Sequence, residues 1–206
     1  MKVMRVELTT ISEMLGTASG DKDIHGTFIA SKAPDAPSRE EEIAAVGVEE
    51  VIEKGMTVFP RDEEGNPILW NYMIRGFFKS ACSAMSKVKD SASSKLKAYK
   101  KEIDLRILVY ADANDKTDRM IQINFDGEIG DCQRPLRGQT AQGERVALAH
   151  SECIPAGAKM TFDIICLVDD DVKLVREWLD YGVFNGLGQW RNSGCGAFTW
   201  KEISLT

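Results

Sequence analysis

Residues 186–198 hold the side chains of this chain that are best suited to contact a polyanion. The segment reads GLGQWRNSGCGAF, with two pairs of glycines around the central QWRNS. Glycine lets the backbone take positive φ and lie close to another chain or to a phosphate. The enclosed aromatic ring, guanidinium and amide groups are typical of contacts to a sugar-phosphate backbone. We expect a loop that faces a polyanion; the alternative is a tight turn with Trp190 buried in the core.

Basic side chains gather in two further segments. Arg75 and Lys79 are four residues apart in a predicted helix and therefore share one helix face, where they could contact a phosphate or form an exposed, solubilising pair. Three more cations lie in a polar, glycine-containing stretch, namely Arg134, Arg137 and Arg145. Guanidinium groups bind phosphates well, but salt bridges to an acidic segment would occupy them equally. The sequence leaves both interpretations open.

The charge is unevenly spread along the chain. The net charge is −6, yet residues 35–64 hold ten acidic against three basic side chains, whereas residues 71–106 hold nine basic against three acidic. A basic face opposite an acidic one fits a groove for a polyanion, or head-to-tail contact between identical subunits. Two solvated surfaces of opposite sign would produce the same pattern.

Several other kinds of site are excluded by residue spacing. The glycine segment is neither a P-loop nor a dinucleotide fingerprint, because no Gly-Lys-Ser/Thr follows and Arg191 stands where the third glycine belongs. The five cysteines are widely spaced and never form a C-x-x-C pair, and the two histidines lie far apart. We therefore expect reduced thiols, no metal site and no cofactor.

The composition is that of an ordinary globular protein. No apolar run reaches the ~18 residues that a membrane span needs. The first residues, MKVMRVELTT, lack the apolar stretch of a signal peptide. We therefore expect a cytoplasmic protein with no membrane partner.

The order of the predicted elements indicates an α+β fold. A strand at 2–11 is followed by an irregular acidic segment at 16–67 and by the strongest helix pattern of the chain at 68–88, with Asn71 as candidate N-cap. The later predicted elements are strands at 102–111 and 120–126, an arginine-rich loop at 126–147, a hairpin around 155–157, a helix at 171–184 and a strand at 196–205. This order predicts an antiparallel sheet with two main helices on one face, a ferredoxin-like or RNA-recognition-motif-like core with a large insertion.

The same motifs resemble the RAMP superfamily, the proteins that form the RNA-holding backbone of CRISPR effector complexes. The first strand followed by Leu15-Gly16-Thr17 is similar to that family's first strand and glycine turn. IRGFFKSACSAM is similar to its basic helix entry, and QGERVALAHSECIPAGAKMTFDI to its arginine loop and following strand. GLGQWRNSGCGAF is similar to its carboxy-terminal glycine-rich loop. The chain also resembles uncharacterised proteins of bacteriophages and prophages of Gram-positive bacteria.

The RAMP resemblance implies a single RAMP-like domain over 1–206, with 16–67 as an acidic insertion or finger and 126–147 as an arginine-rich loop. It implies sequence-independent binding of single-stranded RNA or ssDNA, with several copies, a homo-oligomer, or a subunit of a larger complex along the strand, in antiviral defence. The residues expected to contact nucleic acid are Arg75, Lys79, Arg134, Arg137, Arg145, Gly186, Gly188, Gln189, Arg191, Asn192, Gly194 and Gly196.

The resemblance also raises the question of catalysis. Some RAMP subunits cut RNA with an aspartate in the loop after the first strand, and here that loop contains Asp21, Asp23 and His25. Carboxylates and an imidazole can hold a metal or move a proton, so these residues are the candidates for a metal-dependent endoribonuclease. Their spacing is unspecific, and we favour a protein that binds without catalysis.

A second hypothesis places the chain in another class. A phage or prophage protein-interaction factor, with an anti-defence or structural role, would keep the fold without binding nucleic acid. Convergence of the loop arginines on one open surface favours nucleic-acid binding. Arginines held against the acidic segment favour the interaction factor.

Overall fold

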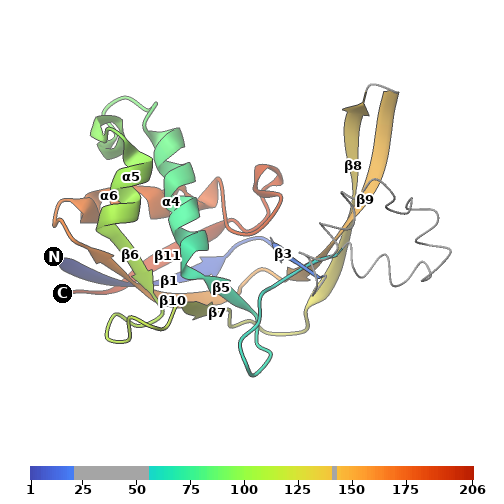
Figure 1. Ribbon diagram of the computed structural model, residues 1–206, viewed down its shortest axis with the longest axis horizontal. Coiled ribbons are helices and arrows are strands. Elements are labelled where there is room, and N and C mark those ends of the chain that lie inside the picture. The colour runs from blue at the N-terminus through green and yellow to red at the C-terminus, as the bar shows by residue number, and fades with distance from the viewer. Residues whose placement is uncertain (21–55, 141–142) are drawn as a thin grey trace, which may run out of the picture.

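The computed structural model describes the backbone of residues 1–20, 56–140 and 143–206, with the side chains of 136–147 excepted. A four-stranded antiparallel sheet in the order β11-β1-β10-β6 forms its centre (Figure 1). The bounds of these strands are β1 Lys2–Thr10, β6 Ile107–Tyr110, β10 Lys159–Cys166 and β11 Phe198–Leu205. Strand β1 pairs along its length with β10, from Lys2 opposite Cys166 to Thr9 opposite Lys159.

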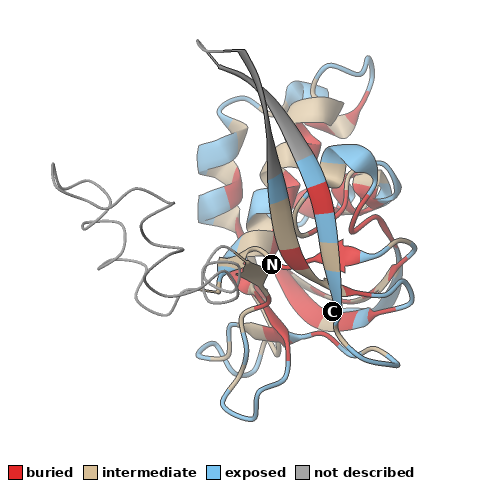
Figure 2. Cartoon of the chain, turned by 90° about the vertical axis from the view of Figure 1, so that its right-hand side faces the viewer, coloured by how far each residue is buried: buried red, intermediate tan, exposed pale blue. Residues whose placement is uncertain are grey.

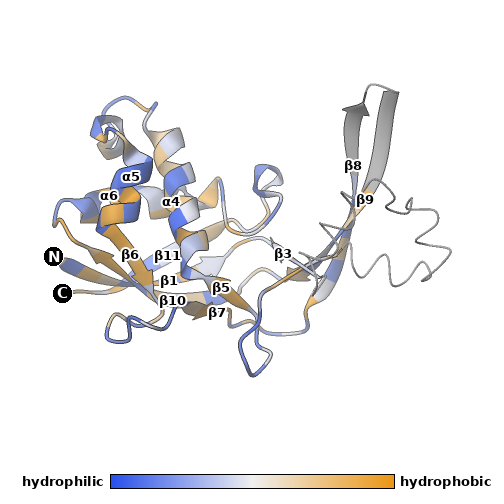
Figure 3. Cartoon of the chain, viewed as in Figure 1, coloured by the Kyte–Doolittle hydropathy of each residue, from blue (hydrophilic) through white to orange (hydrophobic). Residues whose placement is uncertain are grey.

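One face of the central sheet is buried beneath helices. Alternate side chains of β1, namely Met4, Val6 and Leu8, are at most 1% exposed, as expected for a strand with one face in the core. Helices α4 (Asn71–Met85), α5 (Tyr99–Arg106) and α6 (Asp171–Asp180) lie on this side (Figure 1). In Figure 2 the buried strand segments lie below the helices, which carry exposed residues on their outer side. Strand β6 is hydrophobic (Figure 3), and its Ile107 and Val109 are buried in this layer.

Aromatic side chains fill the space between sheet and helices. The ring centroids of Phe77 of α4 and Phe198 of β11 lie 5.1 Å apart, and those of Phe78 and Trp178 lie 5.5 Å apart. The indole nitrogen of Trp178 donates a hydrogen bond to Ser93 Oγ at 2.9 Å, in the 3-10 helix η1 (Ala92–Lys95). This bond ties α6 to the connection after α4.

The chain order and the sheet order together define a ferredoxin-like core. The sequence β1-α4-β6-β10-α6-β11 is a βαββαβ arrangement with both long helices on one face. The predicted α+β, ferredoxin-like fold is therefore confirmed. Helix α5 and η1 are additions between α4 and β6, and α5 continues to Arg106, where the sequence predicted the first half of the strand at 102–111.

A second sheet and a short ribbon extend from this core. Strands β2 (Met14–Leu15), β3 (Ala18–Ser19) and β4 (Thr57–Val58) join the long strands β8 (Gly130–Thr140) and β9 (Gly143–Ile154) in a five-stranded sheet. The β8–β9 hairpin projects away from the helices (Figure 1). Strand β5 (Ile68–Trp70) pairs with β7 (Met120–Gln122).

Two predictions around the arginine-rich segment are wrong. Residues 130–140 form a paired strand rather than part of a loop, because each pairs with β9 from Gly130 opposite Cys153 onward. The hairpin predicted around 155–157 does not form, because β9 pairs with β8 while β10 pairs with β1 and β6. The turn at Gly157, with φ +95°, instead passes the chain from one sheet to the other.

The segment 68–88 also differs from its prediction at its start. It begins as strand β5, and the N-cap of α4 is Trp70 rather than Asn71. The Asn71 amide instead donates a hydrogen bond to the carbonyl oxygen of Val109 at 2.9 Å, which joins the helix start to β6.

The acidic segment predicted at 16–67 is described only at its two ends. Residues 16–20 and 56–67 lie against the second sheet, with Ala18 opposite Val58 and Thr57 opposite Ser151. Residues 21–55 lie outside the described part of the chain, so the acidic finger stays a prediction. Among the residues that are described, no helix has the length and hydropathy to cross a membrane.

Candidate nucleic-acid interface

The segment 186–196, here the glycine loop, is held in place by close backbone contacts. Leu187 N donates to Gly196 O at 3.0 Å, and Gly196 N donates to Glu13 O at 2.7 Å. A Cβ atom on Gly186 would overlap the carbonyl group of Gly196. Gly188 and Gly196 have φ of +82° and +70°, which side chains rarely adopt. The glycines therefore serve a tightly packed, rigid loop.

The rigid loop presents Trp190 to solvent. Trp190 has φ +54° and ψ +34° and is 42% exposed. Left-handed backbone costs a residue with a Cβ about 1–2 kcal/mol, so the loop holds this large ring outward at an energetic cost. The alternative prediction, that Trp190 is buried in the core, is wrong, because Leu187, Cys195 and Ala197 of this segment are the buried side chains.

Arg134 of strand β8 connects the hairpin to the glycine loop. Its guanidinium donates to Gln189 Oε1 at 3.0 Å and to Ser151 Oγ at 3.4 Å. The guanidinium carbon lies 4.9 Å from the centre of the Trp190 ring, a cation–π distance. Arg134 is only 6% exposed, its Nε has no hydrogen-bond partner, and it forms no ion pair within the described residues. A buried cation without a carboxylate gives this junction a positive character.

Arg191 and Asn192 follow Trp190 in a 3-10 turn, η3 (Arg191–Ser193). Arg191 is partly exposed and Asn192 is exposed. Neither side chain has a hydrogen-bond or ion-pair partner within the described part of the chain. The surface next to the indole thus offers a free guanidinium and a free amide. Both groups are hydrogen-bond donors of the kind that contact phosphate oxygens.

Arg75 and Lys79 are placed differently from the expectation. Both face α5, where Lys79 Nζ lies 2.7 Å from Asp104 Oδ1 and the Arg75 guanidinium lies 3.9 Å from the same atom. Sequence reasoning treated them as free cations because Asp104 lies 25 positions beyond Lys79. The carboxylate neutralises part of their charge.

We expect Lys79→Ala to weaken nucleic-acid binding less than Arg191→Ala does, because only Arg191 is without a carboxylate neighbour. The affinities of both variants for a labelled single strand, measured by fluorescence anisotropy at the same ionic strength, check this ranking. A larger loss for Lys79→Ala would assign the contact to α4 instead.

The remaining predicted site residues are only partly described. The backbones of Arg137 and Arg145 lie in the hairpin, with Arg137 opposite Val146 and Arg145 opposite Gly138, but their side chains lie outside the described residues. Asp21, Asp23 and His25 also lie outside them. The part of the chain that the structure describes contains no group of His, Cys, Asp and Glu suited to a metal ion.

The cysteine thiols near the glycine loop do not form an activated nucleophile. Cys195 and Cys153 are free thiols, and burial raises the pKa of both above the usual value. A raised pKa disfavours the thiolate, which is the reactive form.

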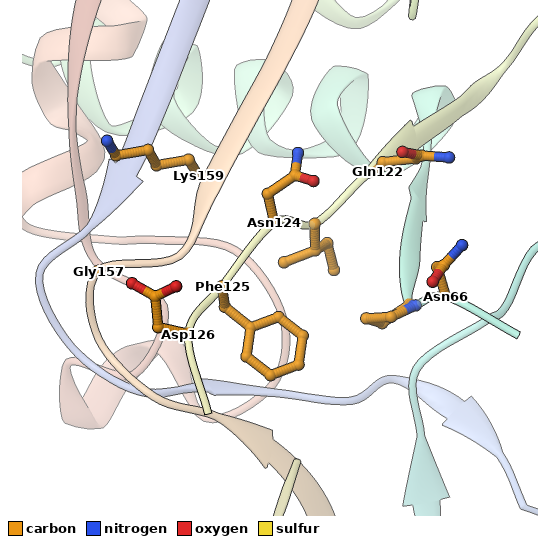
Figure 4. A pocket seen from close by; sticks show the side chains of 9 residues that line it. Asn66, Gln122, Asn124, Phe125, Asp126, Gly157 and Lys159 are labelled. Carbon is orange, nitrogen blue, oxygen red and sulfur yellow. The ribbon is translucent and has the colours of Figure 1, made fainter. Parts of the chain in front are cut away.

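A separate cleft lies beside the β5–β7 ribbon and the start of β10. It has a volume of about 480 Å³ and is lined by residues including Asn66, Gln122, Asn124, Asp126 and Lys159 (Figure 4). Sequence reasoning missed it, because its residues come together from the turn before β5, the end of β7 with the segment that follows it, and the start of β10. Lys159 and Asp126 carry opposite charges, so the cleft lacks the cationic character of the glycine-loop surface.

Comparisons with known proteins add little to this description. No family model matches the chain, and no curated protein matches it. Among solved structures, a chain in the cryo-EM structure of the Type III-B Cmr-beta bound to cognate target RNA is similar, with a TM-score of 0.47 and 11% identity. The match covers 100% of this chain and 60% of that chain. The fold assignment rests on strand order and the site on its own geometry.

Proposed function

We propose that this protein binds single-stranded RNA or ssDNA, mainly through the sugar-phosphate backbone, at the surface formed by the glycine loop and the base of the β8–β9 hairpin. The observation that carries the proposal is the junction of Arg134 with Gln189 and Trp190, beside Arg191, which has no ion pair with any described residue. Two segments far apart in the sequence bring cations, an aromatic ring and amides to one place. This combination is the one that single-strand binding surfaces use.

The local charge supports binding despite the acidic total. The net charge of −6 argues against a general affinity for nucleic acid, so binding has to come from a confined basic surface. Arg134 and Arg191 supply such a surface, and the hairpin that also carries Arg137 and Arg145 continues from it. The proposal includes several copies, or further subunits, arranged along one strand.

Arg191→Ala is expected to weaken binding of a single-stranded oligonucleotide about fivefold to tenfold, because it removes a guanidinium that has no side-chain partner among the described residues. The measurement is fluorescence anisotropy over a series of salt concentrations. Loss of one phosphate contact should lower the slope of log K against log salt by about 0.7. Circular dichroism of the variant checks that the fold is intact.

The matched control is Arg176→Ala on α6. Arg176 is paired with Glu202 of β11 at 2.9 Å, and helix α6 lies away from the β8–β9 hairpin (Figure 1), so loss of Arg176 should leave the affinity and the salt slope unchanged. Equal affinities of wild type, Arg191→Ala and Arg176→Ala would remove the glycine loop from the site. A wild-type protein that binds no single strand even at low salt would favour the interaction-factor hypothesis.

A further inference from the structure

We propose that the exposed face of Trp190 is a stacking surface for one base of the bound strand, so that the site recognises unpaired bases as well as phosphates. This inference rests on the proposed function and makes its ligand more specific. The bases of a duplex are stacked on each other, and only a single strand can place a base against a protein ring. The inference therefore assigns the site to single-stranded segments.

The position of Arg134 determines which face of the Trp190 ring is left for a ligand. Arg134 covers one face of the ring, with its guanidinium carbon 4.9 Å from the ring centre. Because Arg134 lies over one face of the ring, a ligand that contacts Trp190, which is 42% exposed, would meet the opposite face or the ring edge. One free face backed by a fixed cation is an arrangement that suits a planar, electron-rich group.

Hydrogen bonds and backbone contacts hold Arg134 and Trp190 in this arrangement. Arg134 is fixed by Gln189 and by Ser151, which is itself fully buried in β9. Trp190 has a left-handed backbone conformation, and the backbone hydrogen bonds of the glycine loop hold the segment around it. An aromatic ring held outward in a strained conformation points to a ligand that uses the ring. A fixed ring also loses little conformational entropy when a base stacks on it.

The residues that follow Trp190 are polar. Arg191 and Asn192, the next two residues, are free within the described part of the chain and follow the ring in a 3-10 turn. An apolar protein partner on Trp190 would have to desolvate this guanidinium, which is unfavourable without a counter-charge. A nucleotide supplies both a flat base for the ring and a phosphate for the cation. The surroundings therefore favour a nucleotide over an apolar protein surface.

The test separates the base from the backbone. The probes are an adenosine RNA of about 12 nucleotides, within the length range that single-strand binding folds cover, and an abasic ribose-phosphate strand of the same length. We expect the wild-type protein to bind the adenosine strand about tenfold more tightly than the abasic strand. Trp190→Ala should lose this preference and bind both strands like the wild type binds the abasic one. Trp190→Phe should keep most of the preference.

A fluorescence measurement gives an independent readout. The adenosine strand should quench the emission of the wild-type protein and of Trp200→Phe, but not that of Trp190→Phe, because only Trp190 contacts the base. Trp200 is a suitable control, since its indole nitrogen donates to Asp180 at 2.8 Å on the helix side of the sheet.

The outcomes distinguish this inference from the proposed function. If Trp190→Ala weakens binding of the two strands by the same factor, or only changes self-association, stacking is overturned while backbone binding remains. Arg191→Ala should weaken binding of both strands equally, and this result tests backbone binding without any base. If the wild-type protein binds neither strand, the proposed function fails and the stacking surface fails with it.

Discussion

Trp178→Ala is expected to lower the free energy of unfolding by about 4 kcal/mol, which is the typical cost of removing a large aromatic side chain from a closed core. Trp178 of α6 has no exposed surface and packs against Phe78 of α4. Its removal leaves a cavity between the two helices and the sheet. It also leaves Ser93 Oγ, which is fully buried, without its donor. Urea denaturation followed by circular dichroism measures the loss.

Two controls separate the cavity from the hydrogen bond. Trp178→Phe keeps most of the volume and removes the bond to Ser93, so we expect a loss of about 1–2 kcal/mol. Trp200→Ala removes a tryptophan that is only partly buried, and it should cost about 1–2 kcal/mol. A loss for Trp178→Ala no larger than that for Trp200→Ala would mean that α6 does not depend on this contact.

Local patterns were sufficient to predict the elements of the ferredoxin-like core. The buried residues of β1 alternate because successive side chains of a strand point to opposite faces. The apolar stripe of α4 at Ile74, Phe77, Phe78 and Ala81 follows the period of a helix. These patterns depend only on residues that are close in the sequence, and therefore they can be recognised without knowledge of tertiary contacts.

Strand partners were not predictable in the same way. The turn signal at 155–157 indicates that the chain reverses there, but not which strand lies alongside. Strand β10 is buried on both faces from Phe162 onward and lies between β1 and β6, but its apolar sequence does not specify these two neighbours. The same limit applies to 126–147, where polar and glycine residues are typical of a loop and also of an exposed hairpin.

The candidate site was predicted in part, for the same physical reason. The glycine loop could be recognised as a candidate because its residue types lie within one short stretch of the sequence. Its partner Arg134 lies 55 positions from Gln189. The two meet because β8 pairs with β9, β9 pairs with β2, and Gln189 N donates a hydrogen bond to Leu15 O of β2. The neutralisation of Lys79 by Asp104 also depends on how α5 packs against α4. Residue types thus indicated the chemistry, while tertiary contacts decided which cations are free.

Gly186→Ala is expected to lower the free energy of unfolding by about 3 kcal/mol and to abolish binding of single strands. The added Cβ would overlap the carbonyl group of Gly196 and the amide of Ala197. These are backbone atoms, so no change of rotamer relieves the clash, and the loop has to open. Opening the loop moves Trp190 away from Arg134 and removes the fixed surface on which binding depends. Thermal unfolding and anisotropy on the same sample measure both effects.

Two other glycines give a graded set of controls for this variant. Gly194 has φ +88° with open space around its Cα, so Gly194→Ala should cost only about 1 kcal/mol from the left-handed backbone. Gly76 lies on the exposed face of α4 with open space around it, so Gly76→Ala should raise stability by about 0.5–1 kcal/mol. If Gly186→Ala were no worse than Gly194→Ala, the loop would be looser than its backbone contacts imply. If Gly186→Ala loses stability but keeps its affinity, the nucleic-acid strand binds elsewhere on the protein. A binding surface made by the glycine loop requires the backbone contacts that hold the loop closed.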